Sequence, residues 1–198
     1  MRKTKYILLL VVLCASSMLL YSESKEDSFY ARLSKRSSEI TSLTSDFVQI
    51  KQVKLLDTKV VSKGKFYYKK RAEIRFDYSS PKKMSIVMFE NKLDIVTLDK
   101  TTSYDFSKQK SLAELSVVMN ACISGKLKEL PEKYKVDYQE GKKFHNVSIT
   151  NLKRTPDNPY TKIELHFDLE NYSLIELILY ERSQDTTTYS FFNMVTNG

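Results

Sequence analysis

Residues 64–81, GKFYYKKRAEIRFDYSSP, decide how this chain folds. Apolar and polar residues alternate on both sides of a basic interruption at residues 69–73, and such alternation is typical of strands with one covered face. In the second half Ile74, Phe76 and Tyr78 share one face, because successive side chains of a strand point in opposite directions. The stretch therefore predicts a hairpin of two aromatic-rich strands that covers an apolar interior.

The rest of the chain extends this hairpin into a large antiparallel sheet. Strands are predicted at residues 47–55, 58–68, 74–78, 84–89, 93–99, 134–138, 144–152, 163–169, 174–181 and 186–195. Helices are predicted over residues 27–44 and 112–123, where apolar residues recur at helical spacing, and Gly125 can end the second. Short turns favour a meander, and a meander of this length curls. We expect an α+β domain with one large curved sheet.

The first 24 residues have the organisation of a secretory signal peptide. Basic residues at positions 2–5 precede an apolar run over 6–20, which is short for a membrane span, and small residues end at Ser24. We expect a signal peptide over residues 1–24, followed by a single domain over 25–198. Alternatives are cleavage after residue 16 or 17, an uncleaved anchor, and lipidation at Cys14, which lacks the small preceding residue that lipidation needs.

Composition narrows the class of protein further. After the expected cleavage only Cys122 remains, so no intramolecular disulfide can form, which fits a bacterial periplasmic protein held together by its core. Cys122 lies on the apolar stripe of the second helix, and we expect it to be a core residue. The net charge of +8 comes from scattered basic residues without a nucleic-acid-reading motif, so nucleic acid is not an expected partner.

The chemistry-bearing residues do not favour an enzyme. Neither of the two histidines, His145 and His166, has neighbours at metal-ligand spacing. His166 falls on the polar face of its strand, and we expect it to be solvated. The serines lack a nucleophile elbow, and the four glycines cannot build a phosphate-binding loop. We therefore expect no metal, no cofactor and no catalytic residue.

Four short motifs follow the expected signal peptide in a fixed order. They are DFVQ at 46–49, GKFYYK at 64–69, RFDY at 75–78 with Pro81, and FFN at 191–193. Their order and spacing resemble those of the LolA family of periplasmic outer-membrane lipoprotein carriers, and the resemblance covers most of the chain after residue 24. It implies an incomplete, unclosed β-barrel whose helices cover the concave face as a lid.

The resemblance also implies a function without covalent chemistry. A carrier of this family shelters the acyl chains of a lipoprotein that crosses the periplasm of a Gram-negative-type bacterium. It takes the lipoprotein from a LolCDE-like inner-membrane ABC transporter and delivers it to a LolB-like outer-membrane acceptor or to the membrane directly; we expect a monomer. Two alternatives stay open: a sensor or scaffold of the same fold that binds a protein partner, and a lipid-acting hydrolase.

Candidate cavity residues are aromatic, methionine and aliphatic side chains of the predicted strands and the second helix, since such side chains suit soft, adaptable acyl binding. They are Phe47, Phe66, Tyr68, Ile74, Phe76, Tyr78, Met84, Ile86, Met88, Ile95, Leu115, Val118 and Met119. Each of them is also compatible with ordinary core packing, because the faces of the elements are not assigned by the sequence alone.

The resemblance places a lid-contacting basic residue at Lys70, with Arg71 adjacent. Family members often carry Arg-Pro at this position, and lysine lacks the planar fork of arginine, so we expect looser lid closure here. The sequence departs from the family pattern at two further points, which bear on the kind of cargo more than on the fold. Phe76 stands where the family has a tryptophan, and the chain stops at Gly198, where carriers usually continue into one more strand.

Overall fold

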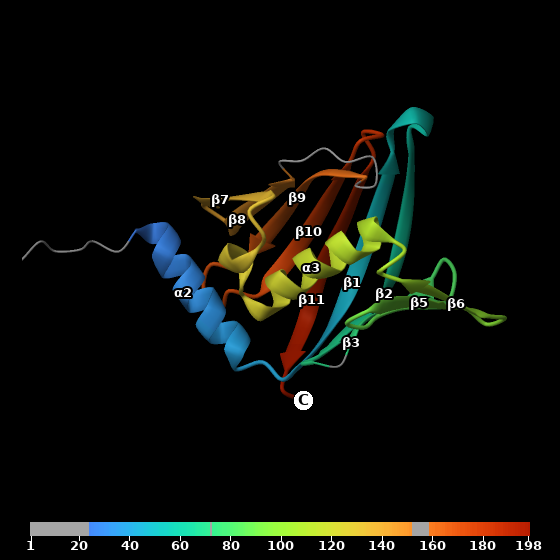
Figure 1. Cartoon of the computed structure of the whole chain (residues 1–198), viewed down its shortest axis with the longest axis horizontal. Helices are drawn as coiled ribbons and strands as arrows, with labels where there is room; N and C mark the ends of the chain where they lie inside the picture. Colours follow the sequence, from blue (N-terminus) through green and yellow to red (C-terminus); the bar gives the residue numbers. More distant parts are fainter. Residues whose placement is uncertain (1–23, 72, 152–158) are drawn as a thin grey trace, which may run out of the picture.

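The computed structural model describes residues 24–71, 73–151 and 159–198, and these form one curved antiparallel sheet of eleven strands (Figure 1). The strand order is β6-β5-β4-β3-β2-β1-β11-β10-β9-β8-β7. The sheet consists of two meanders joined by the pairing of β1 with β11. Within the described residues the edge strands β6 and β7 do not pair with each other, so the barrel is not closed. Apart from Ser24, the expected signal peptide lies outside these residues.

The elements largely follow the predicted pattern, and the α+β fold with one unclosed sheet is confirmed. The helices are α2 (Lys25–Ser38) and α3 (Lys110–Ser124), and short 3-10 turns span Lys54–Leu56 and Leu127–Glu129. The strands are β1 (Ser42–Val53), β2 (Thr58–Lys69), β3 (Glu73–Ser80), β4 (Met84–Met88), β5 (Lys92–Val96), β6 (Thr101–Asp105), β7 (Tyr134–Glu140), β8 (His145–Asn151), β9 (Tyr160–Phe167), β10 (Leu174–Glu181) and β11 (Thr186–Thr196).

The hairpin over residues 64–81 is formed by β2 and β3. Phe66 lies opposite Phe76 in the register, and their ring centroids are 4.9 Å apart. Gly64 stands at a register shift, where a Cβ atom would collide with the carbonyl oxygen of Asp77 and lie 2.8 Å from the Phe47 ring. Glycine at this position therefore allows β3 and the Phe47 ring to approach β2 closely.

The first helix ends earlier than the sequence predicts. α2 begins after Ser24, whose Oγ accepts a hydrogen bond from the Asp27 N–H at 3.0 Å, and it ends at Ser38 rather than at residue 44. Leu43 belongs to β1, where it pairs with Tyr68 on one side and Thr196 on the other. In the strand Leu43 is buried, as it would be in a helix, and the strand also pairs with both neighbours. Tertiary pairing therefore overrides the local helical pattern.

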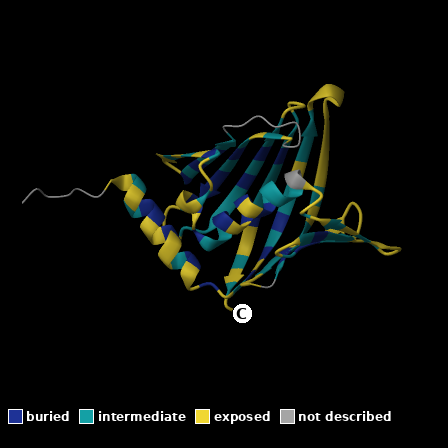
Figure 2. Cartoon of the chain, in the orientation of Figure 1, coloured by how far each residue is buried: buried dark blue, intermediate teal, exposed yellow. Residues whose placement is uncertain are grey.

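The second helix follows its prediction closely. α3 ends at Gly125, which has a φ of 70° in the left-handed region that favours glycine. Its stripe of Val118, Met119 and Cys122 is buried, as the sequence predicts for the cysteine. Figure 1 shows α3 crossing the concave face of the sheet, with α2 beside the β7 edge. Buried positions alternate along the central strands behind α3 (Figure 2).

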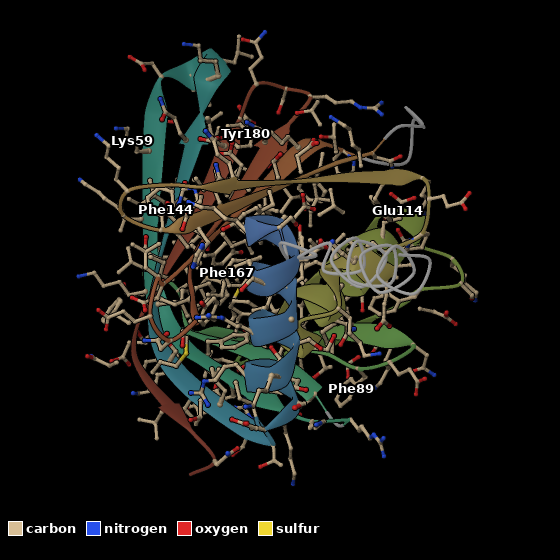
Figure 3. The ribbon with its side chains drawn as sticks, turned by 90° about the vertical axis from the view of Figure 1, so that its left-hand side faces the viewer. Lys59, Phe89, Glu114, Phe144, Phe167 and Tyr180 are labelled. Atoms are coloured by element: carbon tan, nitrogen blue, oxygen red, sulfur yellow. The ribbon has the colours of Figure 1, made fainter. Side chains whose placement is uncertain are left out.

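Two details at the sheet margins correct the sequence expectations. The strand predicted over 93–99 ends at Val96, and β6 follows it as an edge strand that was not predicted. His166 is not solvated, since it is only 9% exposed. Its Nδ1 lies 2.8 Å from Glu176 Oε2, and its ring stacks on Phe144 with centroids 3.9 Å apart. The predicted face is right, but the Phe144 ring, labelled in Figure 3, stacks on the histidine and covers it.

Candidate functional site

A cavity of about 520 Å³ lies between the concave face of the sheet and α3, and we call it the concave cavity. Its volume is within the range of roughly 300–1,000 Å³ that small-molecule sites occupy. Most of its wall is apolar and comes from β3 to β5, β10 and α3. The apolar lining residues are Phe76, Ile86, Met88, Leu93, Ile95, Leu112, Leu115, Met119, Leu177 and Leu179.

One part of the wall is polar. Lys51 and Glu181 line it as an ion pair with 3.3 Å between Nζ and Oε1. The hydroxyl oxygens of Tyr78 and Tyr189 lie 3.3 Å apart nearby. Burial raises the pKa of Tyr189 well above its ordinary value and also raises the pKa of Tyr78, so both phenols are neutral near pH 7.

The structure brings seven of the thirteen predicted cavity residues together in the concave cavity. These are Phe76, Tyr78, Ile86, Met88, Ile95, Leu115 and Met119. Phe47, Phe66 and Val118 are almost fully buried and act in packing the core. Met84, the strand partner of Tyr78, lies at the margin of a groove of about 660 Å³ that is lined mainly by outer-face residues of β1 to β4, such as Val48 and Tyr67, and that we call the convex groove.

The remaining predicted residues surround a second hollow of about 600 Å³, next to the turn between β2 and β3. Tyr68 and Ile74 line it together with Lys70 and Arg71, and it shares Met88 with the concave cavity. Lys70 Nζ donates a hydrogen bond to the Ser38 carbonyl oxygen, which ends α2, at 2.9 Å. Arg71 is exposed in the turn. The basic pair therefore lies where the sheet meets the end of a helix.

Several lining residues were not among the predicted ones. Leu177 and Leu179 come from β10, whose sequence LIELILYE predicts a strand but leaves its inner face unassigned, because Ile178 between them is also apolar. Tyr189 belongs to the alternating residues of β11, but its position in the cavity depends on the pairing of β11 with β1. That pairing joins distant parts of the chain and has no local signal in the sequence.

Other kinds of site find little support in the described residues. Residues 24–71, 73–151 and 159–198 contain no group of three or more His, Cys, Asp or Glu side chains placed to hold a metal ion. The Cys122 thiol is buried, and its burial raises its pKa well above the ordinary value, so it is a poor nucleophile. No helix in this part of the chain is long and apolar enough to cross a membrane.

Comparison with known proteins identifies the family of this chain. The family described as "Outer membrane lipoprotein carrier protein LolA" matches residues 38–198. The chain belongs to this LolA family. The match extends from the end of α2 to the last residue and includes every strand of the sheet. No match was found among the curated proteins.

Several solved structures are similar to this chain at low sequence identity. An uncharacterized conserved protein from Thermus thermophilus is similar with a TM-score of 0.50 and 6% identity, over 88% of this chain and 89% of that chain. A LolA superfamily protein from Nitrosomonas europaea has a TM-score of 0.45 and 10% identity, over 86% and 93%. The MucA/MucB complex of Pseudomonas aeruginosa has a TM-score of 0.49 and 11% identity, over 86% of this chain and 56% of that chain.

Proposed function

We propose that this protein is a periplasmic carrier that binds the acyl chains of lipoproteins in the concave cavity and shuttles lipoproteins from the inner to the outer membrane. The observation that carries the proposal is the apolar cavity between sheet and α3 in a chain of the LolA family. Burial of each methylene is worth about 0.8 kcal/mol, so a lipidated cargo leaves a membrane only if an equivalent apolar surface receives it.

The size of the concave cavity bears on how cargo enters. Its volume of about 520 Å³ is that of a site for one drug-sized ligand. A lipoprotein with two or three chains therefore requires α3 to move away from the sheet. Leu115 and Met119 on α3 line the cavity, so α3 is the element of the lid that leaves when cargo enters.

The partners proposed for this route are those of the family. A LolCDE-like transporter would load the carrier after export directed by residues 1–24, and a LolB-like acceptor or the membrane itself would receive the cargo. One observation favours the membrane: the tip of the β1–β2 hairpin presents Leu55, 91% exposed, and Leu56, 67% exposed. Exposed lysines at 54 and 59 flank these leucines, a pattern suited to an anionic lipid surface.

A second candidate function is a scaffold that binds a protein partner. The convex groove favours it, because its lining includes the exposed side chains of Phe192 and Leu98 together with Val48. In a scaffold that uses this groove, partner binding would be independent of whether the concave cavity is filled. We do not propose the hydrolase, since the family to which the chain belongs is one of carriers.

Purification tests the carrier directly. The full chain is expressed with its first 24 residues in a Gram-negative host, isolated from the periplasm, and extracted for mass spectrometry of bound lipid and lipoprotein. We expect acylated species in near-stoichiometric amount. A periplasmic protein of similar size, purified in the same way, sets the background. Acyl content no higher than this background would overturn the proposal.

A further inference from the structure

The concave cavity is polar where β1 and β11 pair and apolar towards α3. In the register Gln49 lies opposite Tyr189, and Lys51 lies opposite Thr187, and all four side chains line the cavity. Tyr78 reaches the same place from β3. An interior built only to hold hydrocarbon needs none of these groups, because a buried polar atom costs free energy unless it is hydrogen-bonded.

The hydrogen bond between the two tyrosine hydroxyl groups uses only one of their two protons. Their oxygens are 3.3 Å apart, and only one of the two hydroxyl protons can lie between them. The other hydroxyl then has a proton to donate to a third group. The rings are held firmly, since Tyr78 packs edge-on to Phe47 at 5.1 Å and Tyr189 packs against Phe76 at 5.4 Å between centroids.

We propose that the Tyr78–Tyr189 pair is a subsite that donates a hydrogen bond to the ester or amide carbonyl of an acyl ligand whose chain lies against α3. This inference rests on the proposed carrier function and specifies its ligand. A carbonyl oxygen is a good acceptor for the second hydroxyl proton, whereas an ether linkage or a plain hydrocarbon leaves that buried donor poorly matched. The pair therefore sets both the chemical class of the ligand and its orientation in the cavity.

Matched lipids test the subsite. Two phosphatidylglycerols with the same sixteen-carbon chains, one ester-linked and one ether-linked, compete with a fluorescent sixteen-carbon fatty acid for the full chain. We expect the ester lipid to bind roughly three- to tenfold more tightly, as one net hydrogen bond provides. The double variant Tyr78→Phe/Tyr189→Phe keeps the apolar volume. It should abolish the preference for the ester lipid without lowering the affinity for the ether lipid. Tyr104→Phe, which removes another hydroxyl from the cavity wall, is the control.

The outcomes separate the subsite from the carrier function. Equal affinity of the two lipids for the native chain, or an equal loss for both in the double variant, overturns the subsite while leaving the carrier intact. If neither lipid nor the fluorescent acid binds, both proposals fail. If the double variant does not fold, each single variant is measured and should reduce the preference. A triacylated lipopeptide in a parallel titration shows whether the preferred carbonyl belongs to lipoprotein or to free phospholipid.

Discussion

Lys70 is the residue through which the turn after β2 contacts the end of α2. Its ammonium group donates to the Ser38 carbonyl, and its backbone N–H donates to the Thr41 carbonyl, each at 2.9 Å. A cation at a helix C-terminus stabilises it by roughly 0.3–1 kcal/mol, because it meets the negative end of the helix dipole. Lysine forms this contact with one nitrogen, so the contact is easily broken. Because α2 packs against the end of α3 at Gly125, we propose that the contact controls how readily α3 leaves the sheet.

Lys70→Met keeps the aliphatic stem and removes the charge. We expect amides near Ile40 to exchange faster with solvent, and a bound fluorescent fatty acid to dissociate faster, while the unfolding free energy falls by no more than about 1 kcal/mol. Hydrogen exchange followed by mass spectrometry and stopped-flow release measure the two rates. Lys69→Met, at the neighbouring exposed position, is the control. Identical exchange and release in both variants would show that Lys70 has no role in the lid.

At the scale of elements, exposed ion pairs join the N-terminal end of α2 to the rest of the molecule: two are short, and a longer one links Glu26 to Lys128 at 3.7 Å. Asp27 Oδ1 lies 2.6 Å from Lys128 Nζ, and Lys25 Nζ lies 2.6 Å from Glu140 Oε2. The hydrogen bond from Lys128, which does not depend on the expected signal peptide, lowers the pKa of Asp27, and the hydrogen bond from Lys25 lowers the pKa of Glu140. Each short pair links the helix to a different neighbour, the 3-10 turn at Leu127–Glu129 and the edge strand β7.

These shifts predict that α2 loosens in acid. In the folded chain the pKa values of Asp27 and Glu140 lie below the unfolded values of about 3.9 for Asp and 4.3 for Glu. The two short ion pairs therefore stabilise the fold at pH values above the unfolded pKa, and this stabilisation is lost as pH falls through the folded pKa. Between pH 6 and pH 3 we expect the protection factors of α2 amides to fall more than those of β1 and β11. Asp27→Asn with Glu140→Gln should reduce this difference, and an unchanged difference would contradict the account.

At the scale of the whole molecule, the sequence predicts the walls better than the pairing that shapes the cavity. Ile74, Phe76 and Tyr78 are predictable because alternation alone puts them on one face, and the α3 stripe is predictable for the same local reason. The strand over Thr101–Asp105 is not, since its residues alternate weakly and it is held as an edge by β5 alone. The polar part of the cavity also escapes prediction, because the pairing of β1 with β11 brings Tyr189 beside Tyr78.

The central claim is that acyl chains occupy the concave cavity, and filling that cavity tests it most directly. Ile86 is half-buried and lines the cavity from β4, so Ile86→Trp places an indole in the open volume. Val61→Trp adds the same bulk at an exposed position whose strand partner, Ile50, lies on the outer face. Titration with a fluorescent sixteen-carbon fatty acid should give native affinity for Val61→Trp and at least about tenfold weaker binding, a loss of roughly 1.4 kcal/mol, for Ile86→Trp at unchanged stability. Equal affinity in the two variants would contradict the claim.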